Sequence, residues 1–175
     1  MLASENEAYV DLLCVHLALM TKRLRSMPDE LWDWAPNQAA PTARLLASHT
    51  WQWLVCDRQH IFEPDALKHH DIPEVPASPS EICDLLEEET ERWRSLILAL
   101  TSEQFDEPRY QFNRSALDIR SFVCHMIQNS IYKNGQLATL YFALGLDGSE
   151  LYSAAFPYQF YDEIREMAHN KSVTS

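Results

Sequence analysis

The chain has 175 residues, of which 46% are hydrophobic and 23% charged, and its formal net charge is −12. This length suits one domain that buries its own core, and the composition is that of a globular rather than a disordered protein. Because binding to phosphates needs clustered Lys and Arg, the negative charge excludes nucleic acid and anionic membrane surfaces as expected partners. No apolar stretch approaches the roughly 20 residues that cross a bilayer.

The four cysteines are widely spaced and form no CxxC pair. The first residues, "MLASENEAYVDLL", lack the basic and then apolar pattern of a secretory signal. We therefore expect a cytoplasmic protein with reduced thiols, in which the cysteines act as small buried side chains. These are Cys14, Cys56, Cys83 and Cys124.

The first predicted helix runs from about residue 4 to 27, and Pro28 ends it. Apolar residues recur at intervals of three and four, which is typical of a helix face that packs on a core. They are Val10, Leu13, Cys14, Leu17 and Leu24. In the connector that follows, Trp32 and Trp34 are predicted to close one end of the core.

The second predicted helix spans about residues 42–62. One side of it carries Leu45, Leu46, His49, Trp53, Cys56 and His60. The proline-rich segment "EPDALKHHDIPEVPASPS" then forms a connector that is long for a compact bundle. We expect its Lys68, His69 and His70 to face water.

The third predicted helix begins at "SPSE", residues 78–81, where Ser78 and Glu81 can form a capping box with proline in the first turn. Its apolar face is formed by Ile82, Leu85, Leu86, Trp93, Leu96, Ile97 and Leu100. The acidic run "EEETER", residues 87–92, is predicted to face solvent.

The fourth predicted helix follows a short extended segment, "PRYQFN", at residues 108–113. Ser115 and Asp118 are predicted to cap it, and Gly145 to end it. Residues four apart lie one above the other on a helix. The pattern therefore predicts an apolar stripe of Val123, Ile127 and Ile131 and a polar stripe of His125, Asn129 and Lys133.

These elements predict an all-α protein: an up-down four-helix bundle with a long crossover, forming a single domain over residues 1–175. A short aromatic C-terminal helix is expected after Gly145, before a flexible tail at about residues 170–175. Its aromatic residues are predicted to fill core, or else to form a lid or a dimer contact. They are Tyr152, Phe156, Tyr158, Phe160 and Tyr161.

Three segments, "LLASHTWQWL", "HMIQNSIYKNGQL" and "LGLDGSELYSAAFPYQFY", resemble the DinB/YfiT-like four-helix-bundle superfamily over nearly the whole chain. The resemblance implies one metal-binding His on the second helix and an H-x-x-x-H pair on the fourth, just before an R-G-Q-like sequence. In that family the three imidazoles hold zinc or nickel. Characterised relatives include transferases and isomerases that use mycothiol or bacillithiol.

Only one of the three family ligands has a matching His here. His49 matches the second-helix ligand, and with "GQL" at 135–137 as the anchor, the His pair falls on Asn129 and Lys133. Asn is a poor ligand for zinc or nickel, and a protonated Lys about 4 Å from a divalent ion costs roughly 8 kcal/mol at a dielectric near 20. We therefore expect no metal cofactor at the standard triad. A zinc or nickel site displaced by one turn, formed by His49, His125 and Asn129, stays an alternative.

Other interpretations of the polar stripe remain open. Lys133 could hold a small anionic molecule with its ammonium, beside His49 and Asn129, or could extend into solvent. The simplest account of His125 is a buried imidazole satisfied by one hydrogen bond. The residues expected to line a ligand pocket are His49, Trp53, His125, Asn129 and Lys133.

Two classes of function follow from the resemblance. The first is a homodimeric small-molecule-binding or scaffold protein that has lost the usual three-His site. The alternative is a metal-dependent or metal-free transferase or hydrolase, related to thiol-dependent S-transferases, with a rearranged site around His49 and His125.

Overall fold

Four long helices make up most of the structure, a computed structural model that describes residues 4–63, 65, 71–111 and 115–146. Helices α1 and α2 each pack against both α3 and α5, so α1 and α2 lie on opposite corners of the bundle. This confirms the predicted all-α four-helix bundle. The long helices are α1 (Glu5–Ser26), α2 (Ala43–Phe62), α3 (Pro79–Ala99) and α5 (Ile119–Leu144).

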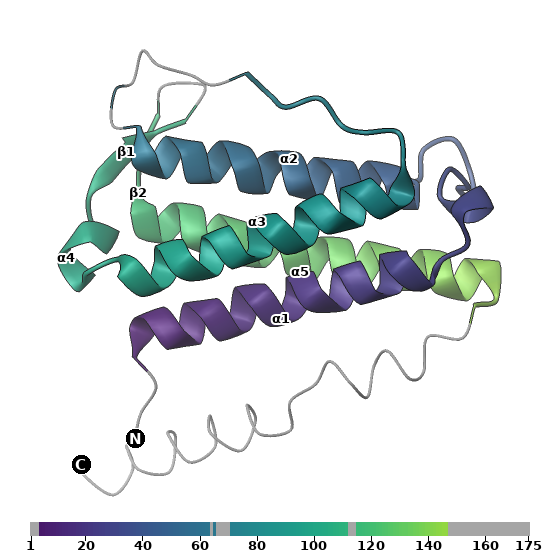
Figure 1. Ribbon diagram of the computed structural model, residues 1–175, viewed down its shortest axis with the longest axis horizontal. Helices are drawn as coiled ribbons and strands as arrows, with labels where there is room; N and C mark the ends of the chain where they lie inside the picture. The colour runs from purple at the N-terminus through teal and green to yellow at the C-terminus, as the bar shows by residue number, and fades with distance from the viewer. Residues whose placement is uncertain (1–3, 64, 66–70, 112–114, 147–175) are drawn as a thin grey trace, which may run out of the picture.

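The directions of the helices explain the long crossover. Figure 1 shows that α1 and α5 run one way along the bundle and that α2 and α3 run the other way. Because α2 and α3 are parallel, the chain between them must return along the length of the bundle, and the proline-rich connector makes this crossing. No helix in the described parts of the chain is both long and apolar enough to cross a membrane.

Side-chain caps fix where the helices begin. Ser4 and Glu7 form a complete capping box at α1, and Asp118 caps α5 by accepting from the backbone N–H of Ser121. At α3, Ser78 accepts from the Glu81 N–H, but the Glu81 side chain makes no return bond, so only half of the predicted box forms. Gly145 ends α5 in the left-handed conformation at φ 66°, as predicted.

A small hairpin precedes α5. The predicted extended segment is strand β1 (Pro108–Tyr110), and it pairs antiparallel with β2 (Ala116–Asp118), which the sequence pattern did not indicate. Ser115 does not cap α5: its carbonyl accepts from the Gln111 N–H at 3.1 Å, next to the hairpin. Two short helices, η1 (Asp29–Leu31) and α4 (Ser102–Phe105), complete the described elements.

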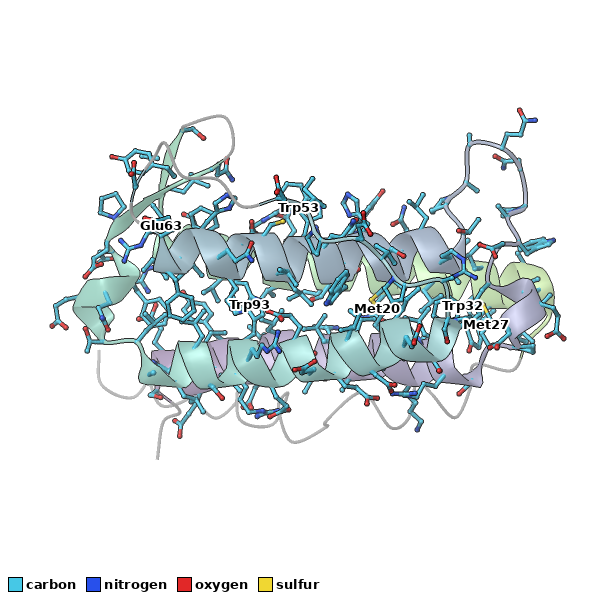
Figure 2. All side chains as sticks on the ribbon, turned by 45° about the horizontal axis from the view of Figure 1, so that its top comes forward. Met20, Met27, Trp32, Trp53, Glu63 and Trp93 are labelled. Carbon is cyan, nitrogen blue, oxygen red and sulfur yellow. The ribbon has the colours of Figure 1, made fainter. Side chains whose placement is uncertain are left out.

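One apolar core joins the four helices. Trp32, Trp93, Phe105 and Phe122 are among its largest fully buried side chains. Figure 2 shows Trp93 between α2 and α3, and Trp32 near one end of the bundle. Trp34 packs against the core from outside, so both tryptophans close this end as predicted. The predicted α1 stripe is buried throughout.

Two predicted helix faces are wrong in part. Leu45 on α2 is 56% exposed, Ile131 on α5 is 45% exposed, and Cys124 is also exposed. The buried face of α2 is rotated by about one residue from the predicted face. Small and apolar side chains next to the predicted ones face the neighbouring helices instead. They include Ala43, Ala47, Thr50, Trp51 and Leu54. The other three cysteines are buried and free, as expected.

The acidic run on α3 is not wholly solvated, which is a second correction. Glu89 is fully buried, at 0% exposure, while Glu87 and Glu88 face solvent. The carboxylate of Glu89 bonds to the guanidinium groups of Arg58 on α2 and Arg92 on α3. A buried carboxylate is tolerated when opposite charge and hydrogen bonds compensate for its lost hydration.

The predicted aromatic C-terminal helix, the tail and residues 68–70 lie outside the described residues.

Candidate functional site

Two stripes of polar residues face each other where α2 packs against α5. His49, Trp53 and Asp57 follow one another at four-residue intervals on α2, and His125, Asn129 and Lys133 do so on α5. Helices that pack side by side bring such stripes together along their length. Contacts recorded in the structure link five of the six residues.

Lys133 lies at one end of this network. Lys133 is only 6% exposed, and its Nζ atom hydrogen-bonds to Nδ1 of His49. Burial lowers the pKa of Lys133 to about 7. The alternative that this side chain extends into solvent is therefore wrong, because position 133 faces the interior of the bundle.

His49 is bonded through both of its ring nitrogens. The indole Nε1–H of Trp53 donates to Nε2 of His49 at 2.9 Å, while Nδ1 meets Lys133. The residue is nevertheless exposed at its outer edge. The pKa of His49 is lowered, first by burial and then by the neighbouring charges of Lys133 and His125.

His125 and Asp57 form the other end of the network, and the sequence pattern did not indicate Asp57. Nδ1 of His125 hydrogen-bonds to Oδ2 of Asp57 at 2.7 Å, and the Asp57 side chain is 1% exposed. The hydrogen bond to Asp57 raises the pKa of His125. The predicted single hydrogen bond is confirmed, but the imidazole is 37% exposed rather than buried. The spacing of Asp57, two turns after His49, was the signal that could have identified it.

Trp53 joins the two imidazoles. Besides donating to His49, its ring packs edge-on against the ring of His125, with centroids 5.6 Å apart and planes at 85°. Figure 2 shows Trp53 on the side of α2 away from α3. The indole therefore holds His49 and His125 in place on one face of the molecule.

Asn129 lies one turn before Lys133 on the same stripe. Its side-chain oxygen Oδ1 is buried and makes no hydrogen bond within the described residues. An unsatisfied buried carbonyl oxygen costs free energy, so this atom favours a ligand that donates a hydrogen bond. His60, by contrast, packs in the core beside Phe122, with ring centroids 6.0 Å apart.

The donor set does not fit a divalent metal ion. Both nitrogens of His49 are bonded to protein groups, and one of these groups is the amine of Lys133, at a position where the family resemblance implies an imidazole. In the described part of the chain, no three His, Cys, Asp or Glu side chains are grouped so that they could hold a metal. The geometry therefore favours neither the standard triad nor the displaced site of His49, His125 and Asn129.

The sequence model of the DinB superfamily matches residues 14–137, which is more than half of the chain. A search of curated proteins found no significant match.

Solved structures share the fold at low sequence identity. YfiT from Bacillus subtilis, described as a probable metal-dependent hydrolase with an unusual four-helix bundle topology, superposes with a TM-score of 0.66 at 19% identity. That match covers 83% of this chain and 91% of YfiT.

Two further structures have similar scores. A DinB-like protein from Bacillus subtilis superposes with a TM-score of 0.63 at 17% identity, covering 80% of this chain and 93% of the other. A DinB-like protein from Bacillus cereus gives 0.61 at 16% identity, covering 81% and 93%. At such identities these likenesses show the fold alone. Because the family model matches most of its length, the chain belongs to the DinB superfamily.

Proposed function

We propose that this chain binds a small polar molecule at the α2–α5 face without a metal ion. The observation that carries the proposal is the hydrogen bond between Lys133 Nζ and His49 Nδ1. In the family pattern both positions belong to metal ligands. Here an amine and an imidazole satisfy each other directly, and a metal would have to break that bond.

The chemistry around the network favours a small carboxylate as the ligand class. His125 is partly exposed, and its hydrogen bond to the buried carboxylate of Asp57 raises its pKa, which favours the form with an N–H available at the surface. The Oδ1 atom of Asn129 cannot bond to a carboxylate, because both groups only accept, so it would accept from a separate N–H or O–H group of such a ligand. Lys133 is buried and bonded to His49, so His125 is assigned as the group that meets the carboxylate of the ligand.

Metal content tests the first half of the proposal. Untagged protein purified without chelators, with and without added zinc or nickel, is expected to contain no stoichiometric metal by inductively coupled plasma mass spectrometry. The double variant Asn129→His/Lys133→His is expected to bind about one zinc per chain, because it completes a three-imidazole set with His49.

A matched control separates a restored site from histidines added at random. The pair Gln128→His/Tyr132→His has the same four-residue spacing on α5 but lies on its exposed face, so it is expected to bind zinc far more weakly. Stoichiometric metal in the wild-type protein that is lost in His49→Ala would contradict the proposal.

Ligand binding tests the second half. Addition of acetate or glyoxylate, both small carboxylates, is expected to shift the imidazole NMR resonances of His125 and to saturate. The resonances of His16, on α1, serve as the internal reference. If neither carboxylate shifts His125, the site does not take this class of ligand.

A second candidate function is metal-free acid–base catalysis. The specific observation is the Asp57–His125 pair, in which a buried carboxylate orients a partly exposed imidazole as in many hydrolytic sites. Hydrolysis of p-nitrophenyl acetate that is lost in both His125→Gln and Asp57→Asn would support it. Equal rates for the wild type and both variants would remove it.

A further inference from the structure

The network around His49 fixes where its protons lie. An indole N–H can only donate, so the bond from Trp53 requires Nε2 of His49 to be an unprotonated acceptor. A neutral imidazole with a bare Nε2 carries its proton on Nδ1. The indole of Trp53 therefore selects the Nδ1–H form of His49.

This form of His49 determines the protonation state of its other partner, Lys133. The Nδ1–H group points at Lys133 Nζ, and an ammonium has three donors but no lone pair to accept it. Only an uncharged amine can accept the hydrogen bond. The three side chains thus form one directed chain, in which Trp53 donates to His49 and His49 donates to Lys133.

The surroundings of Lys133 agree with an uncharged amine. Burial lowers its pKa to about 7. The titratable groups near it are His49 on α2 and His125 on its own helix, while the nearby carboxylate of Asp57 is bonded to His125. On the α1 side, Arg23 bonds to Asn134, the next residue of α5, and adds no negative charge.

We propose that Lys133 is a covalent binding site for small aldehydes and ketones, which its amine captures as an imine. This inference rests on the proposed small-molecule site and names a second feature of its ligand, a reactive carbonyl beside the carboxylate. An uncharged amine in a desolvated site is the nucleophile that imine formation requires, whereas a lysine in water is protonated near pH 7.

The step balances without any further reagent. The Nζ lone pair attacks the carbonyl carbon, a C–N bond forms, and the carbonyl oxygen takes up a proton to give a carbinolamine. The nitrogen then loses its two protons as the C–O bond breaks, and the oxygen leaves as water. The net change is amine plus carbonyl to imine plus water, and solvent at the exposed edge of His49 and His125 carries the protons.

Reductive trapping tests the proposal on the full-length, untagged protein. Glyoxylate is added with sodium borohydride, and peptide mass spectrometry measures the modified fraction of each lysine. At pH 7 Lys133 is expected to be modified at least about 10-fold faster than Lys22, an exposed lysine on α1. This advantage is expected to shrink toward pH 10. Modification of Lys133 no faster than Lys22 at pH 7 would overturn the proposal.

A variant of Trp53 tests the hydrogen-bond argument separately from burial. Trp53→Phe removes the indole N–H, so Nε2 of His49 can carry the proton and Nδ1 can accept from an ammonium. The pH profile of Lys133 labelling is expected to move upward, with at least a threefold slower rate at pH 7. Trp34→Phe, a half-buried tryptophan at the end of the bundle, is the matched control. An unchanged profile in Trp53→Phe would overturn the role assigned to this positioning residue.

Acetate distinguishes failure of the covalent step from failure of the site. Acetate has the carboxylate of glyoxylate but forms no imine under these conditions. If both molecules shift His125 in NMR spectra but no adduct forms at Lys133, the imine proposal is wrong and the binding site stands. If neither shifts His125, the proposed function itself is wrong.

Discussion

Helix α2 contributes to two polar clusters, each of which contains a buried ionisable group. The two clusters differ in whether that group has a partner of opposite charge. Toward α3, the buried carboxylate of Glu89 meets the guanidinium of Arg58. Toward α5, the buried amine of Lys133 meets the imidazole of His49, and its recorded partners in the described residues include no carboxylate. A buried charge with a countercharge stays ionised, whereas one without it tends to become neutral. Removal of one partner should therefore be costly in the first cluster, whereas loss of the ionisable group should be tolerated in the second.

The largest expected effect comes from breaking the ion cluster. Glu89→Gln leaves the guanidinium of Arg58, whose side chain is 19% exposed, without its buried counterion. The free energy of unfolding in urea is expected to fall by about 3–5 kcal/mol. The control is Glu88→Gln, because Glu88 pairs with Arg92 at the surface and should contribute no more than about 0.5 kcal/mol. Equal losses for the two variants would contradict the distinction between them.

Replacing the buried amine of Lys133 should raise the free energy of unfolding rather than lower it. Lys133→Met removes an amine whose charged form is destabilised by burial at the α2–α5 interface, so the free energy of unfolding at pH 7 is expected to rise by about 1–3 kcal/mol. Lys22→Met, at an exposed position, should change it by less than about 0.5 kcal/mol.

The pH dependence of that gain follows from the pKa of Lys133, which falls from 10.5 to about 7 on folding. Between these values the unfolded chain holds a proton that the folded chain lacks, so the wild-type protein becomes more stable as the pH rises. The advantage of Lys133→Met should therefore shrink from pH 7 to pH 10. A constant advantage would show that Lys133 has the same charge in both states.

The smallest expected effect concerns Asp57, which gives His125 a countercharge. Because the folded state raises the pKa of His125, the pair contributes stability below pH 6.5 that is lost as the pH rises through the folded pKa. Asp57→Asn should lower the pKa of His125 in an NMR titration, and should reduce the free energy of unfolding by about 1 kcal/mol more at pH 5 than at pH 8. The exposed pair of Asp33 and Arg44 supplies the control, Asp33→Asn, which should leave His125 unchanged.

Local signals in the sequence were reliable where they act within one helix. The apolar stripe of α1, the caps at Ser78 and Asp118 and the left-handed Gly145 depend on residues close together in the chain, and the structure confirms them. The face of α2 was less predictable, because a rotation of one residue exchanges Leu45 for its buried neighbours. That rotation is decided by the two helices that pack against it.

The sequence by itself determined the helical bundle and indicated the family, because helical periodicity and residue identity are local properties. Only the tertiary structure decided which polar residues meet. It buried Glu89 against Arg58, paired His125 with Asp57, and placed His49 between Trp53 and Lys133. The pairs Glu89–Arg58, His125–Asp57 and Lys133–His49 join residues 31 to 84 positions apart in the chain, so no local pattern specifies them.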